Sequence, residues 1–211
     1  MRVVLLALVA GFFSGLVACV PAPGANCAGA DLSHFRLTNL DLRGINLSGA
    51  TLFRANLGGS DLRGADLSGA DLQMAQMVGT RLDGAELSGA RLYGAELISA
   101  SLDGANLRGA DLGRVDLMLA SLCDADLKGA DLTRAHLRES DLSGADLNGA
   151  KLWWAILVGT NLNGADLSFA SLRWARVEQT DLSAATLRQT ELPGMNLRRL
   201  DAEFYAPDGL R

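Results

Sequence analysis

The sequence predicts an all-β fold in which the chain winds into a four-sided solenoid. Leu returns every five residues from Leu32 to Leu197, at 32 of 34 positions, with Met77 and Val177 at the other two. The residue two before each of these positions is Ala in 23 of the 34 units, and the residue directly before is Asp in 13 and Asn in 5. Aromatic residues make up only 5% of the 211 residues, so Leu and Ala must fill the interior.

A period of five fits neither an α-helix nor a long strand. On a helix, successive Leu residues would step about 140° around the axis and form no stripe. On a flat strand, they would alternate between opposite faces. The period is satisfied if each unit supplies a short extended piece, with Ala and Leu pointing inward, followed by a turn at Gly, Asn or Asp. Four units turning about 90° each would close one coil and place each Leu above the Leu twenty residues earlier.

The unit A-[D/N]-L-x-G, as in Ala65 to Gly69 and Ala145 to Gly149, resembles the pentapeptide-repeat family. The resemblance covers residues 30–199 and implies a right-handed quadrilateral β-helix. Both ends of such a solenoid need caps. We expect Phe35, Leu40 and Ile45 to plug the bottom. Residues 200–211 are expected to cap the top, which Met195, Leu200, Phe204 and Tyr205 can close.

The amino-terminal residues 1–18 read as a signal peptide, because the apolar run at 3–10 has the length of a signal-peptide core. A short spanning or buried helix is the alternative, although Gly11, Ser14 and Gly15 interrupt it. Leu16-Val17-Ala18-Cys19 resembles the bacterial lipoprotein box, which implies lipidation of Cys19. Residues 19–29 would then be a lipid-anchored linker, on the periplasmic or cell-surface side of a bacterial membrane.

The remaining cysteines are Cys27 and Cys123, almost five coils apart. That separation is roughly 20 Å or more at the usual inter-strand spacing, too far for a disulfide. We expect both thiols to be free, or Cys27 to pair with Cys19 if Cys19 is not acylated.

Catalytic and cofactor-binding motifs are not found in the sequence, which predicts a protein that is not an enzyme and has no cofactor or metal. His34 and His136 lie five coils apart, too far to share a metal or act as an acid–base pair. The glycines follow the repeat and not a nucleotide-binding fingerprint. The Asp and Asn ladder could be a calcium site, but we expect these side chains to cap backbone N–H groups beside the turns.

Sorting the units by their place in the coil separates four sides. Side I comprises the units that begin at Ala30 and every twenty residues thereafter, and sides II, III and IV follow in chain order. Side II carries apolar Val78, Leu119 and Val158, side III is acidic, and side IV is polar. All three tryptophans lie on side I. The candidate partner-binding residues there are Phe53, Arg54, Tyr93, Arg114, Arg134, Trp153, Trp154, Arg173 and Trp174.

Two explanations of side I remain open. Outward positions of a solenoid tolerate many residue types, so the aromatic and basic residues of side I can be the result of neutral sequence drift. Against this, aromatic and guanidinium groups are the composition of a binding hot spot. The hypothesis is a non-enzymatic interaction scaffold that binds a protein or glycan through side I.

The alternative function comes from the resemblance, because the family includes DNA-mimicking proteins that protect DNA gyrase from quinolones. The acidic residues of side III fit such mimicry loosely, whereas the predicted export signal and a formal charge of only −5 count against it. The negative charge also argues against nucleic acid as a partner.

Overall fold

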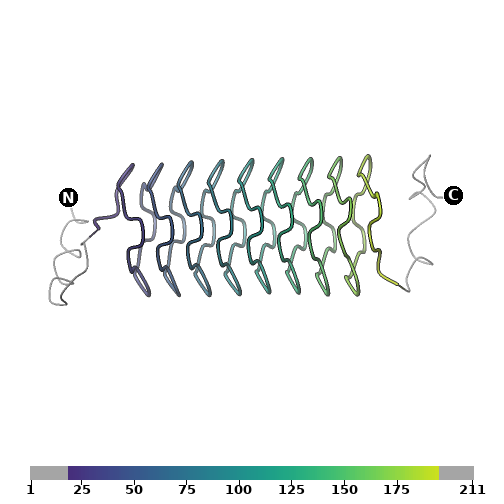
Figure 1. Cartoon of the computed structure of the whole chain (residues 1–211), viewed down its shortest axis with the longest axis horizontal. Coiled ribbons are helices and arrows are strands. Elements are labelled where there is room, and N and C mark those ends of the chain that lie inside the picture. Colours follow the sequence, from purple (N-terminus) through teal and green to yellow (C-terminus); the bar gives the residue numbers. More distant parts are fainter. Residues whose placement is uncertain (1–18, 195–211) are drawn as a thin grey trace.

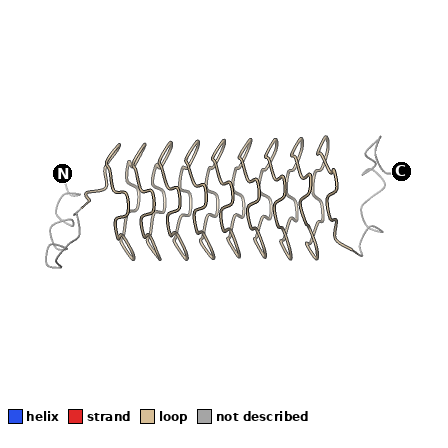
Figure 2. Ribbon diagram, viewed as in Figure 1, coloured by secondary structure: helices blue, strands red, loops and turns tan. Residues whose placement is uncertain are grey.

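The computed structural model describes residues 19–194, and in them the chain winds into a straight tower of stacked coils (Figure 1). Every fifth residue from Asn26 to Ser171 forms a parallel bridge with the residue twenty positions later, giving an unbroken series of 30 bridges. One coil therefore contains four pentapeptides, as the repeat predicts. Within the described residues the extended pieces are single bridging residues separated by turns, so no helix or continuous strand has bounds to give (Figure 2).

Backbone hydrogen bonds join each coil to the next in both directions. The N–H of Leu32 donates to the carbonyl of Thr51 at 2.7 Å, and the N–H of Thr51 donates back to Ala30 at 2.9 Å. Each corner is closed by a turn, as where the N–H of Phe35 donates to Leu32 at 3.2 Å and His34 has φ 64°. A positive φ at the third residue of such a turn is the type II pattern, which favours Gly.

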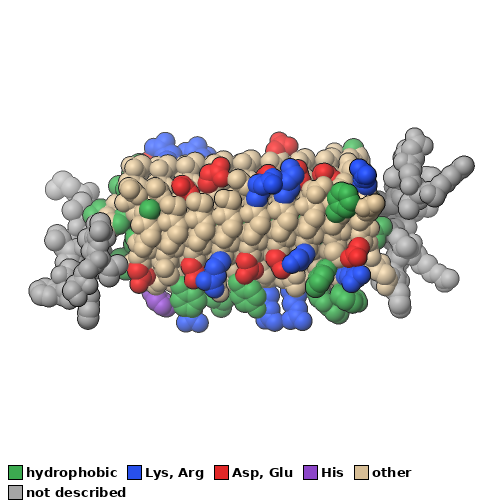
Figure 3. All heavy atoms as spheres, in the orientation of Figure 1, with side chains coloured by type: hydrophobic (Ala, Val, Ile, Leu, Met, Phe, Trp, Pro, Cys, Tyr) green, Lys and Arg blue, Asp and Glu red, His purple; other side chains and the backbone are tan. Residues whose placement is uncertain are grey.

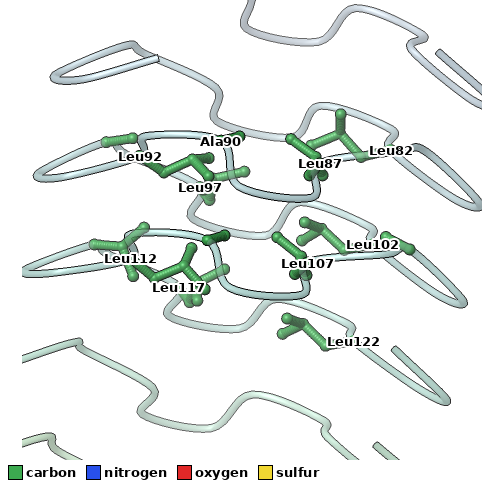
Figure 4. Packing of buried hydrophobic residues seen from close by; sticks show 14 of the residues in the cluster. Leu82, Leu87, Ala90, Leu92, Leu97, Leu102, Leu107, Leu112, Leu117 and Leu122 are labelled. Atoms are coloured by element: carbon green, nitrogen blue, oxygen red, sulfur yellow. The ribbon is translucent and has the colours of Figure 1, made fainter. Parts of the chain in front are cut away.

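The interior is a column of leucines with alanines beside them. Leu82, Leu102 and Leu122 are fully buried at successive levels of the column (Figure 4). Met77 fits the same position with no exposed surface. Where Thr160 replaces an inward Ala, its hydroxyl donates to the carbonyl of Leu137 at 2.6 Å, so the buried polar group is satisfied.

The Asp and Asn ladder caps the turns, which confirms that expectation. Asp66 Oδ1 accepts a hydrogen bond from the N–H of Ser68 at 3.0 Å, and Asp146 Oδ1 accepts one from Asn148 at 3.1 Å. The same contact, two residues along, recurs on the other sides, for example from Ser143 to Asp141. Among residues 19–194, no group of three or more His, Cys, Asp or Glu could hold a metal ion.

The solenoid begins before Ala30, so the expectation of a linker at 19–29 is wrong for residues 20–29. The N–H of Gly24 donates to Arg43 in the next coil at 2.9 Å, and the N–H of Ala25 closes a turn onto Ala22 at 3.1 Å. Pro23-Gly24 suits this turn, because Pro presets its second position and Gly, with φ 67°, tolerates the third. The chain therefore adds two units below the expected start.

The bottom of the tower is closed by a disulfide. Cys27 occupies the inward position that Leu holds elsewhere, is 2% exposed, and is bonded to Cys19 with the Cα atoms 5.2 Å apart. This is the pairing expected for a Cys19 that is not acylated, and Cys123 is free. Of the expected plug, Ile45 is fully buried above Ala25 and Leu40 is partly buried against the core, but Phe35 is 39% exposed and lies above neither added unit.

Several expectations fall on residues outside the described range, namely the signal peptide at 1–18, the cap at 200–211, and Met195, Leu200, Phe204 and Tyr205. The last described coil is less enclosed than the others, because Val177, Leu182 and Leu187 are only partly buried. Within residues 19–194 there is no helix long and apolar enough to cross a membrane.

Candidate functional site

Side I differs from the other sides in its corner residues. Sixteen residues other than Gly have a positive φ among the described residues, and seven of them are on side I, compared with five on side II and two each on sides III and IV. The seven are His34, Arg54, Met74, Arg114, Arg134, Trp154 and Trp174. A left-handed backbone is uncommon for any residue with a Cβ and unfavourable for bulky ones. Side I therefore places large side chains where Gly would cost less.

The upper part of side I is an exposed stack of two indoles. The rings of Trp154 and Trp174 lie 5.0 Å apart between centroids at an interplanar angle of 14°. Their exposed fractions are 51% and 56%. The stacked arrangement of the rings is favourable, and about half of each tryptophan side chain remains exposed to water.

Trp153 lies beside this stack and is held by a chain of hydrogen bonds. Its Nε1–H donates to Ser171 Oγ at 2.7 Å, and the Ser171 hydroxyl donates to Glu191 Oε2 at 2.6 Å. Arg173 closes the chain, since its Nε lies 3.0 Å from the same carboxylate. The chain spans three coils and fixes one end of the aromatic surface.

The lower part of side I combines single aromatic rings with guanidinium groups. The guanidinium of Arg54 lies 5.2 Å from the ring centroid of Phe53, and that of Arg114 lies 6.0 Å from the ring centroid of Tyr93. Tyr93 can lie across the next coil because residue 113 is Gly, where an added Cβ would stand 2.9 Å from the ring. Each pair has the geometry of a cation–π contact.

The basic residues of side I fall into two groups, those that pair with a carboxylate and those that do not. Arg91 and Lys151, at the positions before the Leu, face Asp71 and Asp131 with N–O distances of 3.4 and 3.8 Å. Arg54, Arg114 and Arg134 project from the corners, and no carboxylate pairs with them within residues 19–194. Figure 3 shows basic and hydrophobic side chains gathered along one edge of the tower.

Side III has more acidic residues than any other side, but those of its lower coils form local ion pairs. Arg63 Nη2 lies 2.6 Å from Asp61 Oδ2, and hydrogen bonds from Arg63 lower the pKa of Asp61 to about 2. Arg43 and Asp41 form the same pair one coil below, at 2.7 Å. Higher on side III, no cation within the described residues pairs with Asp103, Asp124, Asp141 or Asp181.

The comparison with protein families finds eight copies of the repeat described as Pentapeptide repeats, over residues 25–52, 45–84, 75–114, 116–153 and 145–183. The chain belongs to the pentapeptide-repeat family. Its matched residues begin at 25, in agreement with the solenoid that starts below Ala30. Among curated proteins, none matches this pentapeptide-repeat chain.

Solved structures of other pentapeptide-repeat proteins are similar to this one. HetL from the cyanobacterium Nostoc sp. strain PCC 7120, described as involved in heterocyst differentiation regulation, is 38% identical over 80% of this chain and 81% of its own, with a TM-score of 0.36. A trypsin-treated variant of QnrB1, a plasmid-mediated fluoroquinolone resistance protein, is 20% identical over 82% of this chain and 91% of its own. Its TM-score of 0.53 shows a shared fold.

The structure brings the predicted residues of side I together in three groups. Trp153, Trp154, Arg173 and Trp174 form one cluster, while Phe53 with Arg54 and Tyr93 with Arg114 form two pairs. Arg134 projects alone below the cluster, and its N–H donates to the Trp153 carbonyl at 2.7 Å. Cys19 belongs to none of these groups and lies in the disulfide at the base.

Sequence reasoning did not single out Ser171 and Glu191, which hold Trp153 and Arg173. Both occupy the position before the Leu, in the two units above Trp153, so the 20-residue spacing was the available signal. On side II, Val78 and Leu119 are exposed as expected, at 45% and 51%, whereas Val158 is 7% exposed and does not belong to the outer surface.

Proposed function

We propose that this pentapeptide-repeat protein is a non-enzymatic interaction scaffold and that side I is its contact surface. The observation that carries the proposal is the exposed stack of Trp154 on Trp174, at corners where the backbone has a positive φ. Trp, Tyr and Arg are the residues enriched in the energetic centres of interfaces. Arg54 and Arg114, held over aromatic rings, extend the surface down the tower.

The family relationship supports the rest of the architecture. We infer that the tower turns as the right-handed quadrilateral β-helix of pentapeptide-repeat proteins. A rigid column of coils holds side I straight, because each coil is bonded to its neighbours and the interior is filled by Leu. A rigid surface loses little conformational entropy on binding, so a preorganised surface such as side I favours tight association with its partner.

The experiment compares binding to a cell-envelope extract by the wild-type protein and by the double variant Trp154→Ala/Trp174→Ala. Phe169→Ala is the matched control, because Phe169 is 50% exposed and has φ 60° at a corner of side IV. We expect captured protein or glycan to be lost in the tryptophan variant and retained in the control. Equal capture by all three proteins would remove side I as the contact surface.

We also propose that the chain is exported and that Cys19 is the site of its lipid anchor. A thioether-linked lipid on Cys19 and a disulfide to Cys27 exclude each other, so the mature protein has one or the other. Palmitate labelling that survives Cys27→Ala and disappears in Cys19→Ala supports the anchor. Labelling that is absent from the wild-type protein, with a Cys19–Cys27 disulfide found by mass spectrometry, refutes it.

Protection of DNA gyrase is the second candidate, favoured by the fold shared with QnrB1 and by the aspartates of side III. The ion pairs of Asp41 with Arg43 and of Asp61 with Arg63 weaken it, because they cancel the charge that a DNA mimic needs. Cell fractionation separates the two functions. A mature protein in the soluble cytoplasm that restores gyrase supercoiling in the presence of a fluoroquinolone would establish protection of gyrase.

A further inference from the structure

Sides I and III carry complementary charge and lie opposite each other, because they are two pentapeptides apart in a coil of four. On side I, Arg114 and Arg134 project without a carboxylate partner in the described part of the chain. On side III, Asp103, Asp124 and Asp141 have no cationic partner there. One tower therefore presents unpaired guanidiniums on one side and unpaired carboxylates on the opposite side.

The two sets of charges also match in height. Arg114 and Arg134 are one coil apart, and Asp124 is ten residues from each, which is half a coil. With coils spaced about 4.8 Å apart, Asp124 lies about 2.4 Å above the level of Arg114 and the same distance below Arg134. Asp103 is 11 residues before Arg114, about half a coil below it, and Asp141 is seven residues after Arg134, about a third of a coil above it. Two level, parallel towers would thus interleave carboxylates with guanidiniums.

We propose that the partner of side I is side III of a second copy of this chain, placed beside the first with both towers parallel and level. The contact centres on Arg114 and Arg134 of one copy and Asp124 of the next. Because the two surfaces differ and are related by a translation, the contact does not close, and towers associate into open rows. This inference rests on the proposed function, since it assigns an occupant to the same surface.

The Asp141 carboxylate accepts hydrogen bonds that favour its charged form. Burial raises the pKa of Asp141, but hydrogen bonds from Ser143, Cys123 and Asn161 together outweigh burial and leave the pKa below its ordinary value. Asp124 stands at a corner with φ 56° and is exposed. The contact is electrostatic and lies at a solvated surface, so it is weak in each pair and sensitive to salt.

The geometry of the tryptophans agrees with a protein surface as the occupant. Trp154 and Trp174 stack on each other, so the two facing sides of the rings are closed to any ligand while about half of each side chain stays exposed. Arg134 lies on the same side, one coil below Trp154. In a level row the outer edges of the two indoles meet the small corner residues of side III at Asn163-Gly164 and Ser183-Ala184, which leave room for them.

The test is sedimentation velocity of the full chain, produced without acylation, over a range of concentrations. Two charge reversals are compared, Arg114→Glu/Arg134→Glu on side I and Asp124→Arg/Asp141→Arg on side III. The control is Arg108→Glu/Lys128→Glu on side IV, which changes net charge as much as the side I variant. Asp124→Arg alone serves as a second side III variant, because within the described residues the Asp124 side chain makes no hydrogen bond that would be lost and its backbone bond to Ser143 is kept.

We expect wild-type association to weaken about tenfold between about 50 and 500 mM salt. Each reversal alone should weaken it about tenfold, and an equimolar mixture of the two reversed proteins should restore it to within about threefold, since every contact is then complementary again. A wild-type protein that stays monomeric, or reversed proteins that associate like the control, would overturn the inference. If the towers stay monomeric while Trp154→Ala/Trp174→Ala still abolishes capture from the extract, only this inference fails. If capture is also unchanged, the proposed function fails with it.

Discussion

The indole of Trp154 lies against that of Trp174, twenty residues later, with the ring planes within 14° of each other. This relationship follows from the coil, because a bridge between Lys151 and Ser171 aligns the two units that carry the rings. Both residues occupy corners where most other units have Gly. The two indoles therefore stand exposed at corners where the backbone has a positive φ, a conformation that is unfavourable for bulky residues.

The first prediction concerns that backbone conformation. Arg134→Gly should raise the free energy of unfolding by about 1 kcal/mol, because Arg134 has φ 62° and makes no ring contact that would be lost. Gly129→Ala is the matched control, at φ 65° with open space around the added Cβ, and it should lower stability by a similar amount. Urea denaturation followed by circular dichroism measures both. Destabilisation by Arg134→Gly would contradict the account of the corners.

Most of the fold could be predicted from the sequence, because a period of five leaves one arrangement that buries every Leu. Leu107 and Asp66 illustrate this, the first fully buried and the second capping its turn as expected. The start of the solenoid was missed, since Val20 to Gly24 carry Ala22 where a Leu is expected. Its turn is recognisable only from Pro23-Gly24, a signal that also occurs in linkers.

The sequence predicts which side of the tower carries the candidate site, but it does not predict the contacts that its side chains make. The sequence assigns Trp153, Trp154 and Trp174 to one side, because the side follows from the residue number and the 20-residue period of the coil alone. It does not distinguish a ring that stacks from one that donates a hydrogen bond to Ser171. That difference depends on rotamers and on the neighbouring coils, including whether a Gly such as Gly113 leaves room for the ring.

A second prediction concerns the base of the tower. In the chain produced without acylation, Cys27→Ser should destabilise the first coil by about 2–3 kcal/mol, from the loop that the disulfide closes and the apolar contacts of a buried side chain. Because coils contact only their neighbours, the loss should be local. Hydrogen exchange should therefore accelerate at Cys27 and Leu32 and stay unchanged at Leu107. Cys123→Ser is the control, and equal acceleration along the whole tower would contradict local closure.

A third prediction concerns acid. Hydrogen bonds and charge from Arg63 hold the pKa of Asp61 at about 2 in the folded protein, below its usual 3.8. The stability that this carboxylate contributes is therefore present above about pH 4 and is lost as the pH falls through about 2. Arg63→Gln should raise the pKa of Asp61 and make the melting temperature fall at a higher pH.

The control for the acid experiment is Arg138→Gln, because Arg138 has no ion pair within residues 19–194. Its melting temperature should follow the wild-type pH dependence. If Arg63→Gln and the wild-type protein lose stability over the same pH range, the pair between Arg63 and Asp61 does not set that dependence.

Photo-crosslinking in intact cells tests the central claim, that side I is the contact surface, most directly. A photoreactive phenylalanine derivative is placed at Trp154 or, as the control, at Phe169, which has a similar exposure and backbone conformation on side IV. The account predicts adducts from position 154 and none from position 169, and an adduct of twice the chain mass would identify a second copy. Adducts from position 169 alone, or equal adducts from both positions, would contradict it.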